Sequence, residues 1–212
     1  MMEKLRSFLQ KPFHNKLNAL YQAWREIFSA LYYRSVFGSF GSGSILYSPM
    51  LISNPQCMHI GKNVLIRSGV RLEAVILDPK NPPELYIGNN VNIEQDVHIV
   101  VIGKIAIGNN VSITARSSLL CGTHPFLDVD SPVKIGNRVS GIGSVIEIGE
   151  GSFLGVGCVL QMNSRLGKHV VVGSNSVVKG RFPDYSVIDG NPAVSVMSYL
   201  PEEGMWKPTL KG

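Results

Sequence analysis

The chain has 212 residues, and its 20 Lys and Arg residues outnumber its 15 Asp and Glu residues, for a formal net charge of +5. This length suits one domain with a sizeable core and short appendages. The positive charge favours an anionic partner, but the aromatic residues are not interleaved with a basic run, so we expect no nucleic acid partner.

Cysteine usage and hydropathy bear on the compartment. The three cysteines form no CxxC pair and leave an odd thiol, which favours a reducing environment. No apolar run approaches about 18 residues, and no signal-peptide core follows the start. We therefore expect a cytoplasmic protein.

Residues 1–44 are expected to form a segment of their own, with a helical pattern. Apolar residues recur there at the spacing of one helix face: Leu17, Leu20, Tyr21, Trp24, Ile27, Phe28 and Leu31. This pattern predicts an amphipathic helix after Pro12, followed by a glycine–serine hinge from Gly38 to Ser44. Two interpretations of the apolar face stay open: packing on this domain or a sister subunit, or peripheral contact of residues 13–34 with the inner face of a membrane.

Residues 45–180 follow a different pattern, in which an aliphatic residue recurs at every sixth position. The clearest run is Ile148, Leu154, Leu160, Leu166, Val172 and Val178. Glycine often follows the aliphatic residue, and a small or β-branched residue often stands four positions after it. A period of six fits neither a helix, which repeats every ~3.6 residues, nor a hairpin sheet, but it fits a solenoid with three six-residue faces per coil.

In such a solenoid the strands of successive coils stack about 4.8 Å apart, and the aliphatic residues point inward. The glycine is expected at a corner, where a positive φ or a close backbone approach excludes a Cβ. Cys158 occupies a small inward position and is expected in the core. The sequence therefore predicts an all-β fold, a parallel β-helix of hexapeptide repeats.

Two stretches interrupt the repeats. Residues 78–86 contain three prolines and are expected to form a loop. Residues 122–132 form a second excursion, after which Ile135 and Ile142 are expected to resume the coils. After residue 180 the pattern stops, so residues 181–212 are expected to form a cap and tail over the open edge of the last coil.

Two motifs accompany the repeats: Gly122-Thr123-His124-Pro125 in the second excursion, and Gly190-Asn191-Pro192-Ala193 near the end. Together they resemble the hexapeptide-repeat acyltransferases, among them the galactoside and maltose O-acetyltransferases. An N-terminal helix followed by coils is more similar to the branch that acetylates sugars during lipopolysaccharide and capsule synthesis. The resemblance implies a left-handed parallel β-helix, a homotrimer, and acetyl-CoA bound as co-substrate in a groove between neighbouring subunits.

The resemblance also implies that His124 is the catalytic general base of a direct transfer. An imidazole is suited to take a proton from a sugar hydroxyl near neutral pH. Asp128 or Asp130 is a candidate to orient this imidazole, and Asp128 is also a candidate contact to the substrate. Cys121 lies three residues before His124, so a cysteine acyl-enzyme is a weaker alternative.

The acceptor is expected to contact polar residues of the coil before His124, namely Asn92, Glu94, Asp96 and His98. Counting six-residue faces places His98 outward, one face away from His124. In the galactoside enzymes this coil carries an asparagine and an aspartate that hold the sugar, and the corresponding residues here are Glu94 and Ile102. The missing aspartate argues against a free galactoside as the acceptor.

The CoA arm is expected to lie along bare backbone at small residues, with its phosphates beside basic residues. The positions that match the family's groove are Gly155, Gly157, Gly173 and Ser174, with Lys179 and Arg181 at the phosphate end. The family's usual Thr-Lys-Asp is replaced here by Lys179-Gly180-Arg181, so the lysine is displaced by one position.

These observations predict an acetyl-CoA-dependent O-acetyltransferase that acts on a sugar, sugar nucleotide or lipid-linked sugar in cell-surface polysaccharide or lipopolysaccharide biosynthesis. Two alternatives stay open: acyl transfer to an amino sugar nucleotide or a small xenobiotic, and a non-enzymatic β-helix scaffold. A carbonic anhydrase on the same fold needs three histidines around zinc, two of them close in sequence. The five histidines here include no close pair, so we expect no metal.

Overall fold

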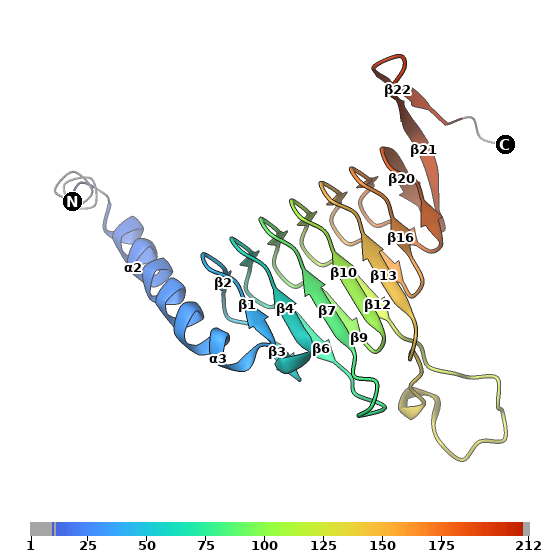
Figure 1. Ribbon diagram of the computed structural model, residues 1–212, viewed down its shortest axis with the longest axis horizontal. Helices are drawn as coiled ribbons and strands as arrows, with labels where there is room; N and C mark the ends of the chain where they lie inside the picture. Colours follow the sequence, from blue (N-terminus) through green and yellow to red (C-terminus); the bar gives the residue numbers. More distant parts are fainter. Residues whose placement is uncertain (1–9, 11, 210–212) are drawn as a thin grey trace.

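The computed structural model describes residue 10 and residues 12–209, and its strands form a parallel β-helix, as the hexapeptide repeats predict, with the left hand that the family resemblance implies. Figure 1 shows the coils stacked side by side, with helix α2 at one end of the stack and a β-hairpin at the other. The strands fall into three sheets, which are the three faces of a prism.

The first face contains β1 (Ser39–Phe40), β4 (Met58–Ile60), β7 (Glu84–Ile87), β10 (Lys104–Ile107), β13 (Val145–Ile148), β16 (Arg165–Leu166) and β19 (Arg181–Phe182). The second contains β2 (Ile45–Leu46), β5 (Leu65–Ile66), β8 (Asn92–Ile93), β11 (Ser112–Ile113), β14 (Phe153–Leu154), β17 (Val171–Val172), β20 (Ser186–Gly190), β21 (Ala193–Leu200) and β22 (Met205–Pro208). The third contains β3 (Leu51–Ser53), β6 (Arg71–Ala74), β9 (His98–Val101), β12 (Ser118–Cys121), β15 (Val159–Gln161) and β18 (Val177–Val178). Short 3-10 helices cover Pro55–Cys57 and Ile135–Asn137.

The sixth-position residues form continuous ladders inside the prism. On the third face the strand register pairs Leu72 with Ile99, Ile99 with Leu119, and Leu119 with Leu160. All four side chains are fully buried. Burial of such a side chain contributes about 1.5–3 kcal/mol, so the period of six in the sequence is also the period of the stabilising core.

The glycines after these aliphatic residues are required because successive coils approach closely. A Cβ on Gly61 would lie 2.5 Å from the carbonyl oxygen of Gly88, and one on Gly149 would meet the carbonyl oxygen of Gly167. The left-handed backbone conformation falls two residues after the glycine instead, as at Asn63, whose φ is 54°. Of the two reasons for expecting glycine at a corner, close approach is the one observed.

Two loops leave the coils: the first begins and ends three residues earlier than the predicted 78–86, and the second is longer than predicted. Residues 75–83 join β6 to β7, and residues 122–144 join β12 to β13. The longer loop projects from the stack as the yellow segment in Figure 1. The prediction that Ile135 and Ile142 resume the coils is wrong, because their side chains are 51% and 56% exposed and lie in this loop.

Helix α2 (Phe13–Phe28) continues through a π-helical turn (Ser29–Tyr33) into α3 (Arg34–Val36) and contacts β2. Polar side chains make this contact: the Arg25 guanidinium donates to the carbonyl oxygen of Leu46, and the Ser29 hydroxyl accepts from the N–H of Leu46. Both polar residues are buried, whereas most of the apolar residues that predicted the helix are exposed. The helix therefore packs on its own domain through this polar side and not through the apolar stripe, so contact of the stripe with a sister subunit or with a membrane stays a prediction.

The two ends of the stack extend beyond the predicted bounds of the coils. Strand β1 already pairs with β4, inside the segment predicted as a hinge, and β19 and β20 continue the parallel stack. Strand β20 then pairs antiparallel with β21, and β21 with β22. Within the described part of the chain, none of the helices has the length and apolar character needed to cross a membrane.

Candidate active site

The loop of residues 122–144 is fastened at its base. Thr123 and Ser140 exchange backbone hydrogen bonds of 2.8 and 3.0 Å, which pair the two ends of the loop. Gly122 and Gly141 flank this pair, and a Cβ on Gly141 would lie 2.9 Å from Cβ of Ile102. Because this pairing immediately precedes His124, the histidine starts from a fixed backbone position.

The imidazole of His124 is oriented by a backbone carbonyl. Its Nδ1 lies 2.9 Å from the carbonyl oxygen of Arg138. A carbonyl oxygen only accepts hydrogen bonds, so Nδ1 carries the proton of the neutral imidazole. Nε2 keeps a free lone pair, and the side chain is exposed. This is the tautomer that a general base requires.

Arg138 also holds the loop in shape. Its guanidinium donates to three carbonyl oxygens, those of Val133 at 2.6 Å, Asp128 at 2.7 Å and Ser131 at 3.3 Å. The Asp128 carboxylate accepts from the N–H of Asp130. The expected orientation of His124 by one of these acids is thus replaced by its hydrogen bond to the Arg138 carbonyl, because the guanidinium gathers the loop backbone beside the ring.

Beside His124, a cavity of about 410 Å³ opens between the loop and the third face of the prism. We call it the acceptor cavity. Its apolar wall includes Val100, Ile102 and Leu120. Its polar lining includes Arg71, Glu73, His98 and His124.

His98 reaches this cavity from the coil next to the one that leads to His124. Arg71 on β6, His98 on β9 and Ser118 on β12 are register partners on the third face. The prediction that His98 lies one face away from His124 is therefore wrong. The count of six-residue steps failed because it passed through residues 101–103, where the period slips between β9 and β10.

His98 and Arg71 bring buried hydrogen-bonding atoms to the acceptor cavity. Among the described residues, Nε2 of His98 and Nε of Arg71 have no hydrogen-bond partner. The Arg71 guanidinium pairs through Nη2 with the Glu73 carboxylate. Burial, with a contribution from the charge of Arg71, lowers the pKa of His98, so its ring is neutral at pH 7. These groups supply donors and acceptors that suit sugar hydroxyls.

A second cavity, of about 370 Å³, extends from the base of the loop over the coils that follow it. We call it the donor cavity. It is lined by residues of later coils, among them Gln161, Asn163, Lys179 and Gly180. Gly122 and Thr123 line both cavities, so the two meet beside His124. Lys179, one of the predicted CoA residues, therefore lies in a cavity that reaches the candidate base.

The remaining predicted site residues lie on other edges of the prism. Asn92, Glu94 and Asp96 belong to β8 and the turn after it, where Glu94 pairs with Arg67 at 3.7 Å. The predicted CoA residues of the turns after β14 and β17 are Gly155, Gly157, Gly173 and Ser174. Arg181 lies on β19, on the first face. These eight residues are all described, and none of them lines the acceptor or the donor cavity.

The cysteines lie inside the prism. Cys121 is fully buried, and its Sγ lies 3.2 Å from Oγ of Ser144 and 3.4 Å from the carbonyl oxygen of Lys104. A thioester cannot approach this sulfur without opening the core, which argues against an acyl-enzyme. Cys158 is fully buried, as predicted, and burial raises the pKa of its thiol. In the described part of the chain, no group of His, Cys, Asp or Glu side chains could hold a metal ion.

Sequence reasoning missed Arg71, Glu73 and Arg138. A plain count of 18 residues per coil does not align Arg71 with His98, because the loop of residues 75–83 lengthens that coil. The sequence nevertheless carries a signal for this alignment: Arg71 immediately precedes the inward Leu72, and His98 immediately precedes the inward Ile99. No such signal exists for Arg138, which acts through loop carbonyls.

Comparisons with known proteins identify several acetyltransferases. No family model matches the chain. The protein WbbJ of Escherichia coli K12, described as a lipopolysaccharide biosynthesis O-acetyl transferase, is 28% identical over 167 residues, which cover 77% of this chain and 83% of WbbJ. The serine acetyltransferase of Haemophilus influenzae is 27% identical over 114 residues, which cover 51% of this chain and 42% of that enzyme.

Solved structures share the fold. A mutant of AntD, an N-acyltransferase from Bacillus cereus in complex with dTDP and coenzyme A, aligns with a TM-score of 0.64 and 18% identity, covering 84% of this chain and 91% of AntD. A maltose O-acetyltransferase from Clostridium difficile 630 aligns with a TM-score of 0.51 and 20% identity, covering 90% and 80% of the two chains. At these identities the likeness concerns the fold alone.

Proposed function

We propose that this chain is a hexapeptide-repeat acyltransferase and that it transfers the acetyl group of acetyl-CoA to a sugar hydroxyl in the synthesis of a lipopolysaccharide or another cell-surface polysaccharide. The similarity to WbbJ over most of both chains supports this class of acceptor. One observation carries the chemistry: the hydrogen bond from Nδ1 of His124 to the Arg138 carbonyl leaves Nε2 free beside two adjoining cavities.

The proposed reaction is a direct transfer. Nε2 of His124 takes the proton of the acceptor hydroxyl while the hydroxyl oxygen bonds to the thioester carbonyl carbon. The carbon–sulfur bond then breaks, and the sulfur leaves with the electron pair. The protonated imidazole returns its proton to this sulfur, which gives the O-acetyl sugar and free CoA. The Arg138 carbonyl favours this cycle because it also stabilises the imidazolium formed midway.

The acceptor sugar is placed in the acceptor cavity. Arg71, Glu73 and His98 would hydrogen-bond its hydroxyls, and the apolar wall would cover one side of the ring. Ile102 lies in that wall, and the resemblance matches this position to a sugar-holding aspartate of the galactoside enzymes. A sugar that needs a carboxylate at this point would bind poorly, so the chain is proposed to take a different sugar from those enzymes.

We place acetyl-CoA in the donor cavity, with its thioester toward His124 and its phosphates toward Lys179. The small residues of the turns after β14 and β17 would reach this ligand only from a second copy of the chain. Asn92, Glu94 and Asp96 would likewise reach the acceptor only from a second copy. The proposal therefore includes a homotrimer, in which each site lies between two subunits.

The test compares variants of the two cavities. His124→Ala should lower kcat by roughly 10²–10⁴-fold, the usual cost of losing a general base, while the affinity for acetyl-CoA stays unchanged. Lys179→Ala should raise KM for acetyl-CoA and leave kcat nearly unchanged. Thioester consumption measured across a panel of sugars and nucleotide sugars gives both constants.

Cys121→Ser serves as the control for an acyl-enzyme. It should keep most of the activity, because the transfer needs no thiol nucleophile. An active His124→Ala variant, or a well-folded but inactive Cys121→Ser variant, would refute the assignment of His124 as the base.

A further inference from the structure

The apolar stripe of helix α2 faces away from the protein. Its members recur at helical spacing along one side of α2 and the turn after it: Phe13, Leu17, Leu20, Trp24, Ile27 and Leu31. Leu20, Ile27 and Leu31 are 58%, 60% and 73% exposed. This is unusual for an amphipathic helix, whose apolar side normally packs on the core.

The helix is nevertheless firmly attached, by another side. Arg25 and Ser29 bind the backbone of Leu46, and Tyr33 is buried in the core cluster. The Tyr21 hydroxyl lies 3.3 Å from Oγ of Ser48. The stripe is therefore held outward by a fixed contact on an adjacent side, and it does not result from a helix that has failed to dock.

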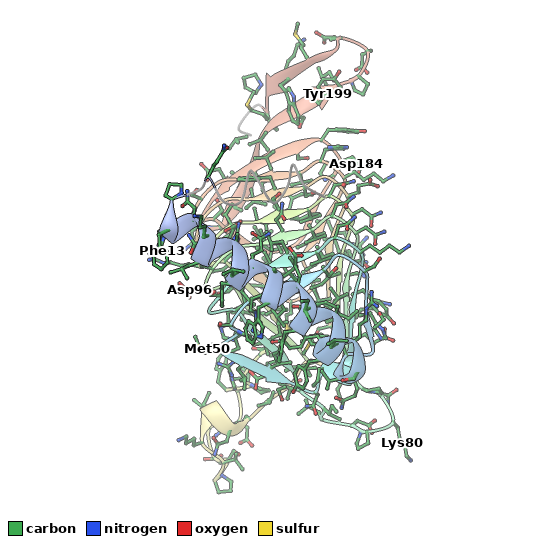
Figure 2. The ribbon with its side chains drawn as sticks, turned by 90° about the vertical axis from the view of Figure 1, so that its left-hand side faces the viewer. Phe13, Met50, Lys80, Asp96, Asp184 and Tyr199 are labelled. Atoms are coloured by element: carbon green, nitrogen blue, oxygen red, sulfur yellow. The ribbon has the colours of Figure 1, made fainter. Side chains whose placement is uncertain are left out.

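The stripe lies at one end of the prism. Figure 2, which faces this end, shows α2 crossing in front of the coils, with Phe13 and Met50 on the same end of the molecule. Met50, in the turn between β2 and β3, is 72% exposed and adds a second exposed apolar site at this end. A flat partner could therefore contact the helix and this end of the prism together.

The charges around the stripe select the partner. In residues 12–36, Arg34 is exposed and Lys16 is partly exposed, whereas Arg25 is buried against Leu46, and Glu26 is the one acid of this segment. A helix with Trp, Phe and Leu on one side and cations on its flanks suits the interface of an anionic bilayer. A second copy of the helix would instead bring cations against cations.

We propose that helix α2 docks this protein on an anionic membrane surface, with the stripe in the interface between head groups and acyl chains. The prism would then stand with its first coil toward the membrane and its later coils away from it. A saccharide carried on a membrane lipid would be presented to the enzyme at that surface. The docking itself does not depend on acyl transfer.

The experiment measures co-sedimentation of the full chain with vesicles, in the absence of acetyl-CoA and acceptor. Vesicles of phosphatidylcholine with phosphatidylglycerol should bind the protein, and vesicles of phosphatidylcholine alone should bind it more weakly. Binding to the anionic vesicles should fall as salt is raised, because salt screens the flanking cations.

Two double variants add the same charges to opposite sides of the helix. Leu20→Glu with Ile27→Glu places two acids on the stripe, and the bound fraction should fall about tenfold or more. Asn15→Glu with Gln22→Glu places two acids seven residues apart on the polar side, and binding should fall much less. All four positions are exposed, so both variants should fold, which circular dichroism checks.

Three results would overturn the proposal. The first is a wild-type chain that stays in the supernatant with anionic vesicles. The second is an equal loss of binding in both double variants, which would mean that net charge alone decides binding. The third is a stripe variant that changes its oligomeric state while its binding to anionic vesicles stays that of the wild type, which would assign the stripe to a subunit contact. Acyl transfer is assayed separately, so failure of the proposed function would be seen independently.

Discussion

His98 and His124 line the same cavity, but their rings are held differently. His124 is exposed and bonds through Nδ1 to a carbonyl, whereas His98 is half-buried on β9. Burial and the charge of Arg71 lower the pKa of His98, and they outweigh the opposite effect of Glu73. The folded protein therefore binds a proton at His98 less readily than the unfolded chain does.

This difference predicts a pH-dependent stability. Because folding lowers the pKa of His98, its stabilising contribution is present above the unfolded value of about 6.5 and is lost as the pH falls through that value toward the folded one. His98→Gln keeps a polar side chain that does not titrate. Between about pH 7.5 and pH 5, Tm should therefore fall more in the wild type than in the variant. Parallel Tm changes in the two proteins would contradict this assignment.

Residue types allowed some parts of the site to be predicted from sequence and not others. His124 could be predicted as a site residue because its neighbours form a recognisable motif on a loop. His98 could be predicted as an outward residue, although the sequence count assigned it to the wrong face of the prism. The hydrogen-bond partner of His124 could not be predicted, because any residue can supply a backbone carbonyl. Only the folded loop brings the carbonyl of Arg138 to the ring.

At the scale of elements, the loop of residues 122–144 shows the limit of local patterns. Ile135 is followed by glycine and, four positions later, by Val139, as in a repeat. Neither side chain enters the prism, because Arg138, between them, gathers the loop carbonyls around its guanidinium. Helix α2 shows a similar limit. Its apolar period predicted a helix, but the side that packs on β2 is the one that carries the polar residues Arg25 and Ser29.

The loop geometry predicts a positioning role for Arg138. Arg138→Lys keeps the charge but loses the planar fork that reaches three carbonyls. We expect kcat to fall about tenfold, because a less ordered loop orients His124 less well. KM for acetyl-CoA should stay nearly unchanged, because Arg138 does not line the donor cavity. Steady-state kinetics with acetyl-CoA varied separates the two constants.

Lys134→Gln is the matched control, since Lys134 is an exposed cation of the same loop. It should leave both constants near those of the wild type. Unchanged kcat in Arg138→Lys, or an equal loss in the two variants, would show that the guanidinium does not position the base.

At the scale of the whole molecule, the repeat made the architecture predictable. Each aliphatic residue at the sixth position contacts its counterparts on neighbouring coils, so one periodic pattern determines strand order, register and core together. The arrangement of subunits does not follow from this pattern, because it depends on outward residues and loop tips. Those positions carry no period.

The tip of the long loop provides the observation that bears on assembly. Leu127 and Val129 are 85% and 86% exposed, although they stand only a few residues from His124. Two apolar side chains so close to the site are costly to leave in water in a single chain. In the proposed homotrimer a neighbouring prism would cover them and complete the cavities beside His124.

Light scattering should therefore give a mass near three times that of the 23.1 kDa chain. Leu127→Asp with Val129→Asp should shift the protein toward monomers and lower activity, because the loop tip would lose its neighbour while His124 itself is retained. Lys80→Asp with Asn81→Asp adds acids to the other, shorter loop and should leave both mass and activity unchanged. A wild-type monomer with full activity would exclude a shared site, since each chain would then complete both cavities alone. A trimer that persists in the Leu127 and Val129 variant would instead place the subunit contact elsewhere on the prism.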